Sequence, residues 1–432
     1  MNLVNGIIID EAECTAVLEN IEDLILKTLQ KPALDVNRVI NACARLVENM
    51  ESLEIMQKLP ELGINPAMVQ MYSAQIKESL GGEAIRRRLE IELGKGFDLP
   101  KPLRYSSNGA EAEQRLMPVG VIFHITAGNV DGLPFLSLLE GLLTGNINIV
   151  KLPKDEGGIT AMLLMELFKA APELAEYVYV FDYSSKDIYA MKTLAGLANA
   201  IVVWGGDEAV SAVRRLAEPN TKIIEWGHKI SFAYVSKAGI NQASLQKLAQ
   251  HICLTNQLFC SSCQGIFLED ASETDIDDFC KLFLPILEQA SKEHSLAQSE
   301  VERLFIQAQS TLELYHQKLE RRKSGKRIFK GKACSITACS NSKLEPSIMY
   351  RNPWVKPMLR QDILRLRAYK SYLQTVALIC GEEEHTELAE LLLKAGVVKI
   401  SLPLEMSDYS LGEAHDGVFP LRSYTRIISD FK

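Results

Sequence analysis

The chain has 432 residues, of which 47% are hydrophobic and 24% are charged. These values are typical of globular protein and exclude the disordered, collagen-like and disulfide-scaffold classes. At roughly 100–200 residues per domain, the length predicts two or three domains. The formal net charge of −8 does not favour nucleic acid as a partner.

Residues 10–95 have apolar positions at helical spacing, which predicts a helical N-terminal segment. From residue 117 onward, short apolar runs alternate with helical patterns, which predicts a mostly parallel sheet with ligands at the carboxyl ends of its strands. The expected strands are 119–125, 147–152, 177–181, 200–204, 223–225 and 232–235. The expected helices are 133–143, 162–171, 188–198 and 207–216.

A second α/β region follows in the chain. Its expected helices are 241–254, 272–291, 297–322 and 384–395, and its expected strands are 264–268, 375–380, 397–402 and 424–428. The longest apolar stretch, 132–150, is interrupted by Glu140, Asn146 and Asn148, so we expect no integral membrane span. The first ten residues lack a positive segment and a cleavage site, so no signal peptide is expected. The nine scattered cysteines indicate free thiols in a reducing compartment, and the expected location is cytoplasmic.

Cys260 is the candidate nucleophile. It lies in N-Q-L-F-C-S-S-C-Q-G, residues 256–265, between an expected helix and an expected strand. A cysteine at such a junction can be exposed in a cleft, where a lowered pKa makes it nucleophilic. Most free cysteines are instead small buried hydrophobes. Cys263 is the second candidate, and the two form a CxxC; without a second CxxC or a closely spaced His pair, a zinc site is disfavoured.

Small and polar residues follow three of the expected strands in the first region. Asn129 could donate to an oxyanion, although a Gly-Asn pair is usually only a turn. Lys151 ends the next strand at the expected ligand edge, or is an ordinary strand-capping lysine. The amides of Gly205 and Gly206 could approach a phosphate before a helix. A complete GxGxxG fingerprint is absent, which disfavours an ordinary Rossmann enzyme.

These residues occur in the order of a known signature. Asn129, an apolar helix, a Gly-Asn pair and a strand ending in Lys151 resemble the aldehyde dehydrogenase superfamily. The E-W-G-H-K segment that begins at Glu225 resembles its E-L-G-G-K element, and Cys260 follows at a separation close to that family's. Its E-x-F-G-P element, which contacts the cofactor ribose, has no clear counterpart around residues 352–363.

The chain resembles still more closely the LuxC-type acyl-CoA reductases, the long-chain fatty acyl reductases of bacterial luminescence. The matching elements, spread over about residues 115–432, are W-G-G-D-E-A-V (204–210), G-H-K-I-S (227–231), C-S-S (260–262), L-Q-T (373–375) and H-D-G (415–417). The resemblance implies an α/β, aldehyde dehydrogenase-like fold with an open, mostly parallel cofactor sheet. The expected divisions are a helical N-terminal segment and cofactor-binding domain (1–235), a catalytic domain (236–400), and a C-terminal return with an oligomerisation strand (401–432).

The resemblance also implies a reaction. The Cys260 thiolate attacks an acyl thioester, such as acyl-CoA or an acyl carrier, while Asn129 and a backbone amide stabilise the oxyanion. Hydride from NADPH then reduces the acyl-enzyme to the aldehyde. The role of Glu225 is open between proton transfer and holding its loop. The implied cofactor-binding residues are Thr126, Lys151, Lys154, Gly205, Gly206 and Gly227.

Lys154 favours NADPH over NADH. The wider family often has an acid three residues after its cofactor lysine, and a lysine there would suit a 2′-phosphate. Alternatively, Lys154 simply points to water, and Asp155 and Glu156 dilute the local charge.

Three alternatives are open. The first is an aldehyde dehydrogenase working in the oxidative direction, which requires Glu225 as a base for water. The second is a cofactor-independent Cys acyltransferase or thioesterase that uses Cys260 alone. The third is a catalytically silent member of a multienzyme acyl complex. The expected partners of the reductase are an acyl-protein synthetase or acyltransferase and further copies of the chain in a homo-oligomer.

Overall fold

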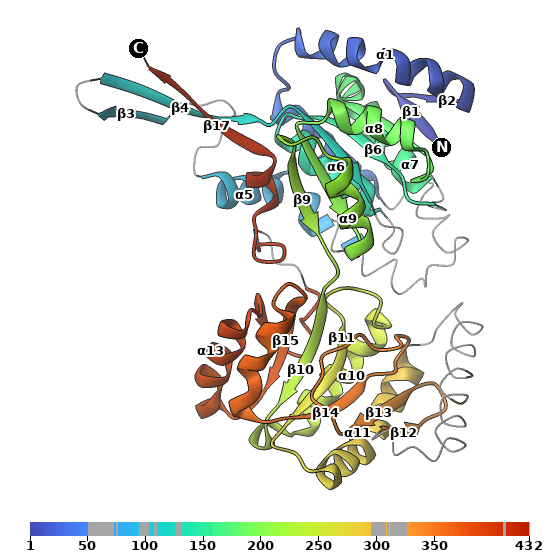
Figure 1. The fold of residues 1–432 in the computed structure, drawn as a ribbon, viewed down its shortest axis with the longest axis vertical. Coiled ribbons are helices and arrows are strands. Elements are labelled where there is room, and N and C mark those ends of the chain that lie inside the picture. Colours follow the sequence, from blue (N-terminus) through green and yellow to red (C-terminus); the bar gives the residue numbers. More distant parts are fainter. Residues whose placement is uncertain are drawn as a thin grey trace. The chain divides into compact units, whose positions relative to one another are not determined.

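The computed structural model describes residues 1–50, 73–74, 77–94, 103–107, 110–126, 132–154, 156, 158–294, 308, 311, 326–408 and 412–431. These residues form two compact units (Figure 1). The first contains the described residues up to Gly227 together with the C-terminal segment after residue 409. The second runs from His228 to residue 409. The boundary expected at residue 235 falls at the end of strand β10, which lies in the sheet of the second unit.

A seven-stranded sheet forms the centre of the first unit, in the order β2-β1-β7-β6-β5-β8-β9. The strands are β1 (Asn2–Val4), β2 (Ile7–Ile9), β5 (Val121–Ile125), β6 (Ile147–Lys151), β7 (Val178–Phe181), β8 (Ala200–Trp204) and β9 (Lys222–Trp226). From β7 to β9 all neighbours are parallel, and the β1–β2 hairpin adds antiparallel to β7. Every residue of β6 and β7 is buried, which explains their continuous apolar runs. The sequence pattern does not predict the β1–β2 hairpin.

Helices of the first unit pack around this sheet (Figure 1). They are α1 (Glu11–Leu29), α2 (Val36–Asn49), α5 (Gly82–Leu93), α6 (Leu133–Leu143), α7 (Ile159–Ala170), α8 (Ile188–Leu197) and α9 (Asp207–Leu216), with a short 3-10 helix, η2 (Pro172–Tyr177), and the turn α14 (Pro420–Ser423). Asp10 and Glu13 form a capping box that begins α1. The predicted N-terminal helices are confirmed for the described residues, and α6 and α9 have the predicted bounds.

A separate three-stranded antiparallel sheet projects from the first unit (Figure 1). Its strands are β3 (Leu103–Ser107), β4 (Ala110–Pro118) and β17 (Thr425–Phe431). The C-terminal strand β17 pairs with β4, so that Thr425 lies opposite Pro118. The sequence predicts β17 but not β3 or β4. The use of β17 in oligomerisation stays a prediction.

The second unit contains another seven-stranded sheet, in the order β12-β13-β14-β11-β10-β15-β16. Its strands are β10 (Ile230–Val235), β11 (Cys263–Glu269), β12 (Lys326–Lys330), β13 (Ser335–Cys339), β14 (Trp354–Met358), β15 (Leu373–Ile379) and β16 (Lys399–Ser401). All neighbours are parallel except β12 and β13. The sequence predicts β10, β11, β15 and β16 but not β12, β13 or β14.

Helices α10 (Gln242–Thr255), α11 (Glu273–Glu293) and α13 (His385–Ala395) complete the second unit, with the 3-10 helices η3 (Lys237–Gly239), η4 (Arg360–Tyr369) and η5 (Glu382–Glu384). The central strand β10 is buried on both faces. Ala233 and Val235 belong to one core cluster, and Phe232 and Tyr234 belong to another. The helix predicted over 297–322 lies almost entirely outside the described residues.

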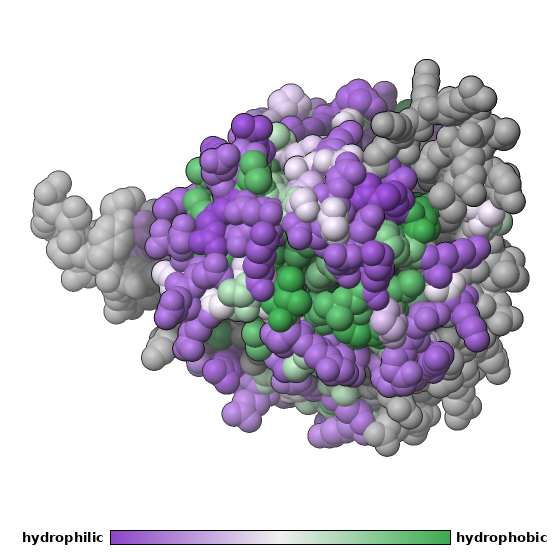
Figure 2. Space-filling view, turned by 90° about the horizontal axis from the view of Figure 1, so that it is seen from below, coloured by the Kyte–Doolittle hydropathy of each residue, from purple (hydrophilic) through white to green (hydrophobic). Residues whose placement is uncertain are grey.

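Some apolar side chains remain on the surface. In the second unit, Leu359, Leu393 and Leu402 are exposed. Figure 2 shows one face on which hydrophobic side chains gather inside a border of hydrophilic ones. Among the described residues, no helix combines the length and apolar character that a membrane crossing requires.

Candidate active site

Cys260 lies in the turn that joins α10 to β11, and its side chain is exposed. The other eight cysteines are buried or partly buried free thiols. Cys263 is fully buried in β11, where its Sγ lies 3.3 Å from the carbonyl oxygen of Gly265. Burial raises the pKa of the Cys263 thiol to about 12, so this residue is held as a neutral thiol. Of the two candidates, Cys260 therefore has the exposure that a nucleophile needs.

A buried amide network holds the turn before Cys260. Asn256 and Gln257 both adopt left-handed backbone conformations, with φ of 47° and 62°. The Gln257 carboxamide donates to the carbonyl of Cys263 (2.8 Å) and accepts from the backbone N–H of Asn352 (2.8 Å). Two successive non-glycine residues in this region are unfavourable, so the surrounding bonds must hold them there. The turn is therefore a fixed support for Cys260.

Arg351 ties this turn to two helices from inside the second unit. Its buried guanidinium donates to Asn256 Oδ1 (2.9 Å) and to the carbonyl of Ser291 (2.9 Å). It also donates to the carbonyls of Cys253 (3.4 Å) and His294. Three of these acceptors are at or near the C-terminal ends of α10 and α11, where carbonyl groups carry partial negative charge. The buried guanidinium of Arg351 thus finds its hydrogen-bond acceptors there among backbone carbonyl oxygens.

Two further side chains contact Cys260 from β10 and β15. The carboxamide of Gln374 donates to Cys260 Sγ at 3.4 Å, and the hydroxyl of Ser231 donates to the Cys260 carbonyl at 2.7 Å. Both residues are buried. They stand 114 and 29 positions from Cys260, so only the order of strands in the sheet brings them together. The sequence contains them in its L-Q-T and G-H-K-I-S elements but does not assign them a role.

Thr126 and Lys151 meet at the carboxyl edge of the first unit's sheet. They follow or end the neighbouring strands β5 and β6, and Thr126 Oγ1 donates to the Lys151 carbonyl (3.3 Å). Lys151 is only 7% exposed, and burial lowers the pKa of its ammonium. Within the described part of the chain, that ammonium forms no ion pair or hydrogen bond. A nearly buried cation of this kind fits an anionic or hydroxyl-bearing ligand. Asn129 lies outside the described residues.

The backbone is accessible at glycines that follow β8 and β9. A Cβ added at Gly206 or Gly227 would meet no atom within 4 Å, whereas one at Gly205 would lie 3.0 Å from the Ala209 Cβ. A ligand can therefore approach the first two closely. The first turn of α9, however, contains Asp207 and Glu208, which disfavour a phosphate directly at that helix N-terminus. Lys154, the predicted 2′-phosphate ligand, is exposed.

Glu225 is paired within the first unit. On β9, its Oε1 accepts from Arg214 Nε at 2.6 Å, and its Oε2 accepts from Arg214 Nη2 at 2.8 Å. This is the two-pronged geometry in which a guanidinium holds a carboxylate in one orientation. Both oxygens are thus engaged, unlike those of a base that is free to bind a water molecule.

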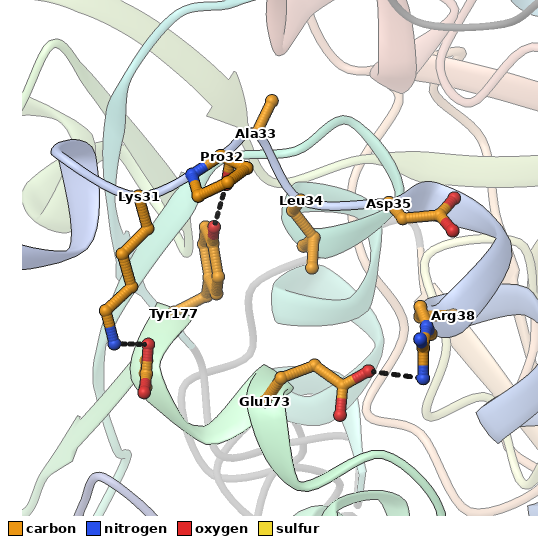
Figure 3. Close-up of a pocket in the computed structure, with 9 residues that line it drawn as sticks. Lys31, Pro32, Ala33, Leu34, Asp35, Arg38, Glu173 and Tyr177 are labelled. Carbon is orange, nitrogen blue, oxygen red and sulfur yellow. Dashed lines mark hydrogen bonds and ion pairs between the residues drawn. The ribbon is translucent and has the colours of Figure 1, made fainter.

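A surface pocket of the first unit does not contain the predicted residues (Figure 3). Its charged side chains pair with one another: Lys31 with Glu176 at 2.6 Å, and Arg38 with Glu173 at 3.3 Å. Tyr177 donates to the carbonyl of Pro32 (3.3 Å). The two candidate regions, one around Cys260 in the second unit and one at the sheet edge near Lys151 in the first unit, therefore both lie outside this pocket.

Two buried histidines predict how stability depends on pH. His124 in β5 bonds Ser137 (2.8 Å) and Asn148 (3.1 Å), and His251 in α10 accepts from the Cys263 N–H (3.3 Å). Burial lowers both pKa values from 6.5 to about 4. Between these values the unfolded chain binds protons that the folded chain does not. Their contribution to stability is therefore complete above about pH 7 and falls toward pH 4, by up to about 1.4 kcal/mol per pH unit for each histidine.

Thermal unfolding at a series of pH values tests this expectation. The unfolding temperature should fall between about pH 7 and pH 5, and His124→Gln, which does not titrate in this range, should flatten the fall. An equally steep fall in the variant would contradict the assignment to His124.

The fold is that of an aldehyde dehydrogenase. A glyceraldehyde-3-phosphate dehydrogenase, GapN from Methanocaldococcus jannaschii, solved with NADP, has a TM-score of 0.71 and 11% identity, covering 98% of this chain and 95% of that one. A putative methylmalonate-semialdehyde dehydrogenase from Sinorhizobium meliloti, solved with NAD, has a TM-score of 0.66 and 15% identity, covering 100% and 94%. The predicted fold class is confirmed.

Within this fold class, the chain belongs to the acyl-CoA reductase (LuxC) family, whose model matches residues 32–427. The long-chain acyl-protein thioester reductase of Aliivibrio fischeri is 25% identical over 332 residues, covering 73% of this chain and 64% of that protein. Long-chain acyl-protein thioester reductase 2 of Photobacterium leiognathi is 25% identical over 325 residues, covering 74% and 66%. The matches thus span slightly less than two thirds of these relatives. The resemblance found in the sequence is confirmed.

Proposed function

We propose that this protein reduces a long-chain fatty acyl thioester, such as acyl-CoA or an acyl-protein, to the aldehyde with NADPH. The observation that carries the proposal is the exposed Cys260, held in a fixed turn with the Gln374 amide on its sulfur. Membership of the acyl-CoA reductase family supports the reaction class. The names of the relatives, which are reductases of acyl-protein thioesters, support the substrate class.

In the proposed reaction, the Cys260 thiolate forms a bond to the thioester carbonyl carbon, and the electron pair moves to its oxygen. The donor thiolate then leaves and takes up a proton, and the acyl group remains on Cys260. Asn129 and a backbone amide would stabilise the oxyanion. NADPH, when bound, would supply the hydride to the acyl carbon. The bond between that carbon and Cys260 Sγ would then break, returning its electron pair to the sulfur as thiolate and releasing the aldehyde.

The first unit supplies residues that fit a dinucleotide. Lys151, with its nearly buried ammonium, and Thr126 would hold ribose or phosphate groups at the sheet edge. The open backbone at Gly206 and Gly227 would admit the cofactor closely. Lys154 places a cation on the surface of the first unit, and because a cation suits a 2′-phosphate, NADPH is proposed over NADH.

An aldehyde dehydrogenase in the oxidative direction is the second candidate, because the fold is shared. That reaction needs a base to activate water for hydrolysis of the acyl-enzyme. Arg214 engages both oxygens of Glu225, the residue that would serve. The pair therefore supports reductive release of the aldehyde and a structural role for Glu225.

Replacing Arg214 with methionine is expected to release Glu225. Without NADPH, hydrolysis of the acyl-enzyme to free fatty acid should rise by about tenfold, which is less than the roughly 10²–10⁴-fold effect of a well-placed base. The rise can be measured as the decay of the acyl-enzyme mass. Arg215→Met, at the next position of α9, is the matched control and should leave the decay unchanged. A rise that persists in the Arg214→Met/Glu225→Gln double variant would show that the released Glu225 carboxylate is not the base for water.

The proposal is tested by incubating the full chain with a series of fatty acyl-CoA chain lengths and either NADPH or NADH. We expect aldehyde release that depends on NADPH, and an acyl-enzyme when the cofactor is left out. Acyl transfer to water or another acceptor with no cofactor dependence would support the acyltransferase or thioesterase alternative. Absence of any acyl-enzyme with all donors would support the catalytically silent alternative.

Further partners belong to the same proposal. An acyl-protein donor implies a synthetase or acyltransferase that loads it, and β17 with its neighbour β4 would form the contact of a homo-oligomer. Sedimentation of the chain with and without residues 425–431 tests the second point, since loss of an assembly contact would leave smaller particles.

A further inference from the structure

The sheet of the second unit is irregular beside Cys260. Along β10, the pairing advances from Ile230 to Phe232, while on β15 it advances from Leu373 to Val376. Two steps on β10 thus face three steps on β15, so β15 carries an extra residue at this point. The β10–β11 pairing shifts at the same place, after Ser231. Such bulges re-aim side chains and are frequent next to active sites.

Ser231 provides a hydrogen-bond partner for a backbone amide at this bulge. Its Oγ accepts from the Thr375 N–H at 3.1 Å, which gives that amide a partner where the regular ladder is interrupted. The same hydroxyl donates to the Cys260 carbonyl at 2.7 Å and lies 3.3 Å from Gln374 Oε1. A hydroxyl has one hydrogen, so the shorter bond to Cys260 is the principal one. Ser231 therefore joins the turn of Cys260 to the bulge of β15.

Gln374 projects from that bulge to the reacting atom. Its Nε2 donates to Cys260 Sγ at 3.4 Å, and the residue is 7% exposed. A carboxamide N–H donor bonds a thiolate more strongly than a neutral thiol, because the bond to the anion is charge-assisted. A donor that bonds the thiolate more strongly than the thiol lowers the pKa of the thiol. The pairing thus promotes loss of the thiol proton to solvent.

We infer that Gln374 is a catalytic residue that stabilises the Cys260 thiolate through its carboxamide, and that Ser231 is the residue that positions it. The inference rests on the proposed function, in which Cys260 is the nucleophile. It adds a hydrogen-bond donor on the sulfur, from β15, to the two donors expected at the oxyanion, Asn129 and a backbone amide. After acylation the same N–H would remain next to the sulfur, which is now the thioester sulfur.

The test is the pH profile of Cys260 alkylation by iodoacetamide in the full chain, read at that residue by peptide mass. Gln374→Met keeps the length of the side chain but removes the donor. We expect the midpoint of the profile to move up by about one to two pH units and the rate near pH 7 to fall by about 10–100-fold. The rate at high pH, where the thiolate is fully formed, should match the unaltered protein.

Gln361→Met, an exposed glutamine of the same unit, is the matched control and should leave the profile unchanged. Ser231→Ala should give a smaller upward shift, because the amide remains but is less well oriented. An unchanged midpoint in Gln374→Met, or a changed high-pH rate with the same midpoint, would overturn the inference. Alkylation needs neither acyl donor nor cofactor, so this failure is distinct from failure of the aldehyde assay.

Discussion

Replacing Cys260 with alanine is expected to reduce aldehyde formation by at least about 10³-fold, because loss of the nucleophile removes the covalent route. Intact-mass measurement after addition of acyl-CoA should show one acyl group on the unaltered protein and none on the variant. NADPH binding should be largely unchanged, since the residues proposed to hold it belong to the first unit.

Cys263→Ala provides the matched control. This cysteine stands three positions away but is fully buried, with a pKa raised to about 12. The variant should still be acylated at Cys260 and should still release aldehyde. Acylation of the Cys260→Ala protein at Cys263 would show that the nucleophile has been assigned to the wrong sulfur.

Replacing Arg351 with methionine is expected to lower the free energy of unfolding of the second unit by about 3–5 kcal/mol. Methionine fills similar apolar volume, but it leaves the amide oxygen of Asn256 and three helix-end carbonyls without their donor. Because the turn before Cys260 loses its support, the pH profile of alkylation at that thiol should also become broader.

Urea unfolding followed by fluorescence measures the effect, with Trp354 reporting from the second unit and Trp204 and Trp226 from the first. Arg367→Met is the control: this exposed arginine donates to one carbonyl, that of Lys394, at 3.0 Å, so the change should stay within about 0.5 kcal/mol. Equal urea midpoints for Arg351→Met and the control would contradict the structural role of Arg351.

Much of the fold follows from local patterns. The strands of the first sheet that run from β5 to β9 are short, apolar and bounded by turn residues, so their periodicity predicts them directly. The periodicity does not predict strand β14, because Lys356 and Pro357 interrupt its apolar pattern. The structure explains the lysine, whose buried ammonium donates to the Lys343 carbonyl and to Glu345, both at 2.6 Å.

Strands β3 and β4 escape sequence-based prediction for another reason. Their segments show little apolar alternation, and the partner of β4 on one side is β17, from the opposite end of the chain. Pairing of this kind depends on contacts between residues that are distant in sequence. A local pattern does not contain this information. The local pattern predicts the C-terminal strand β17, but it does not predict the three-stranded sheet that this strand completes.

The sequence by itself determined the fold class, the family resemblance and the choice of Cys260 as candidate nucleophile. Each of these depends on the order and spacing of short elements, which are properties of the sequence. Only the tertiary structure decided which neighbours Cys260 has and that Cys263 is buried. The same holds for the pairing of Arg214 with Glu225. The physical reason is that strand order and a bulge in β15 set the contact between Cys260 and Gln374, and neither is encoded within any one segment.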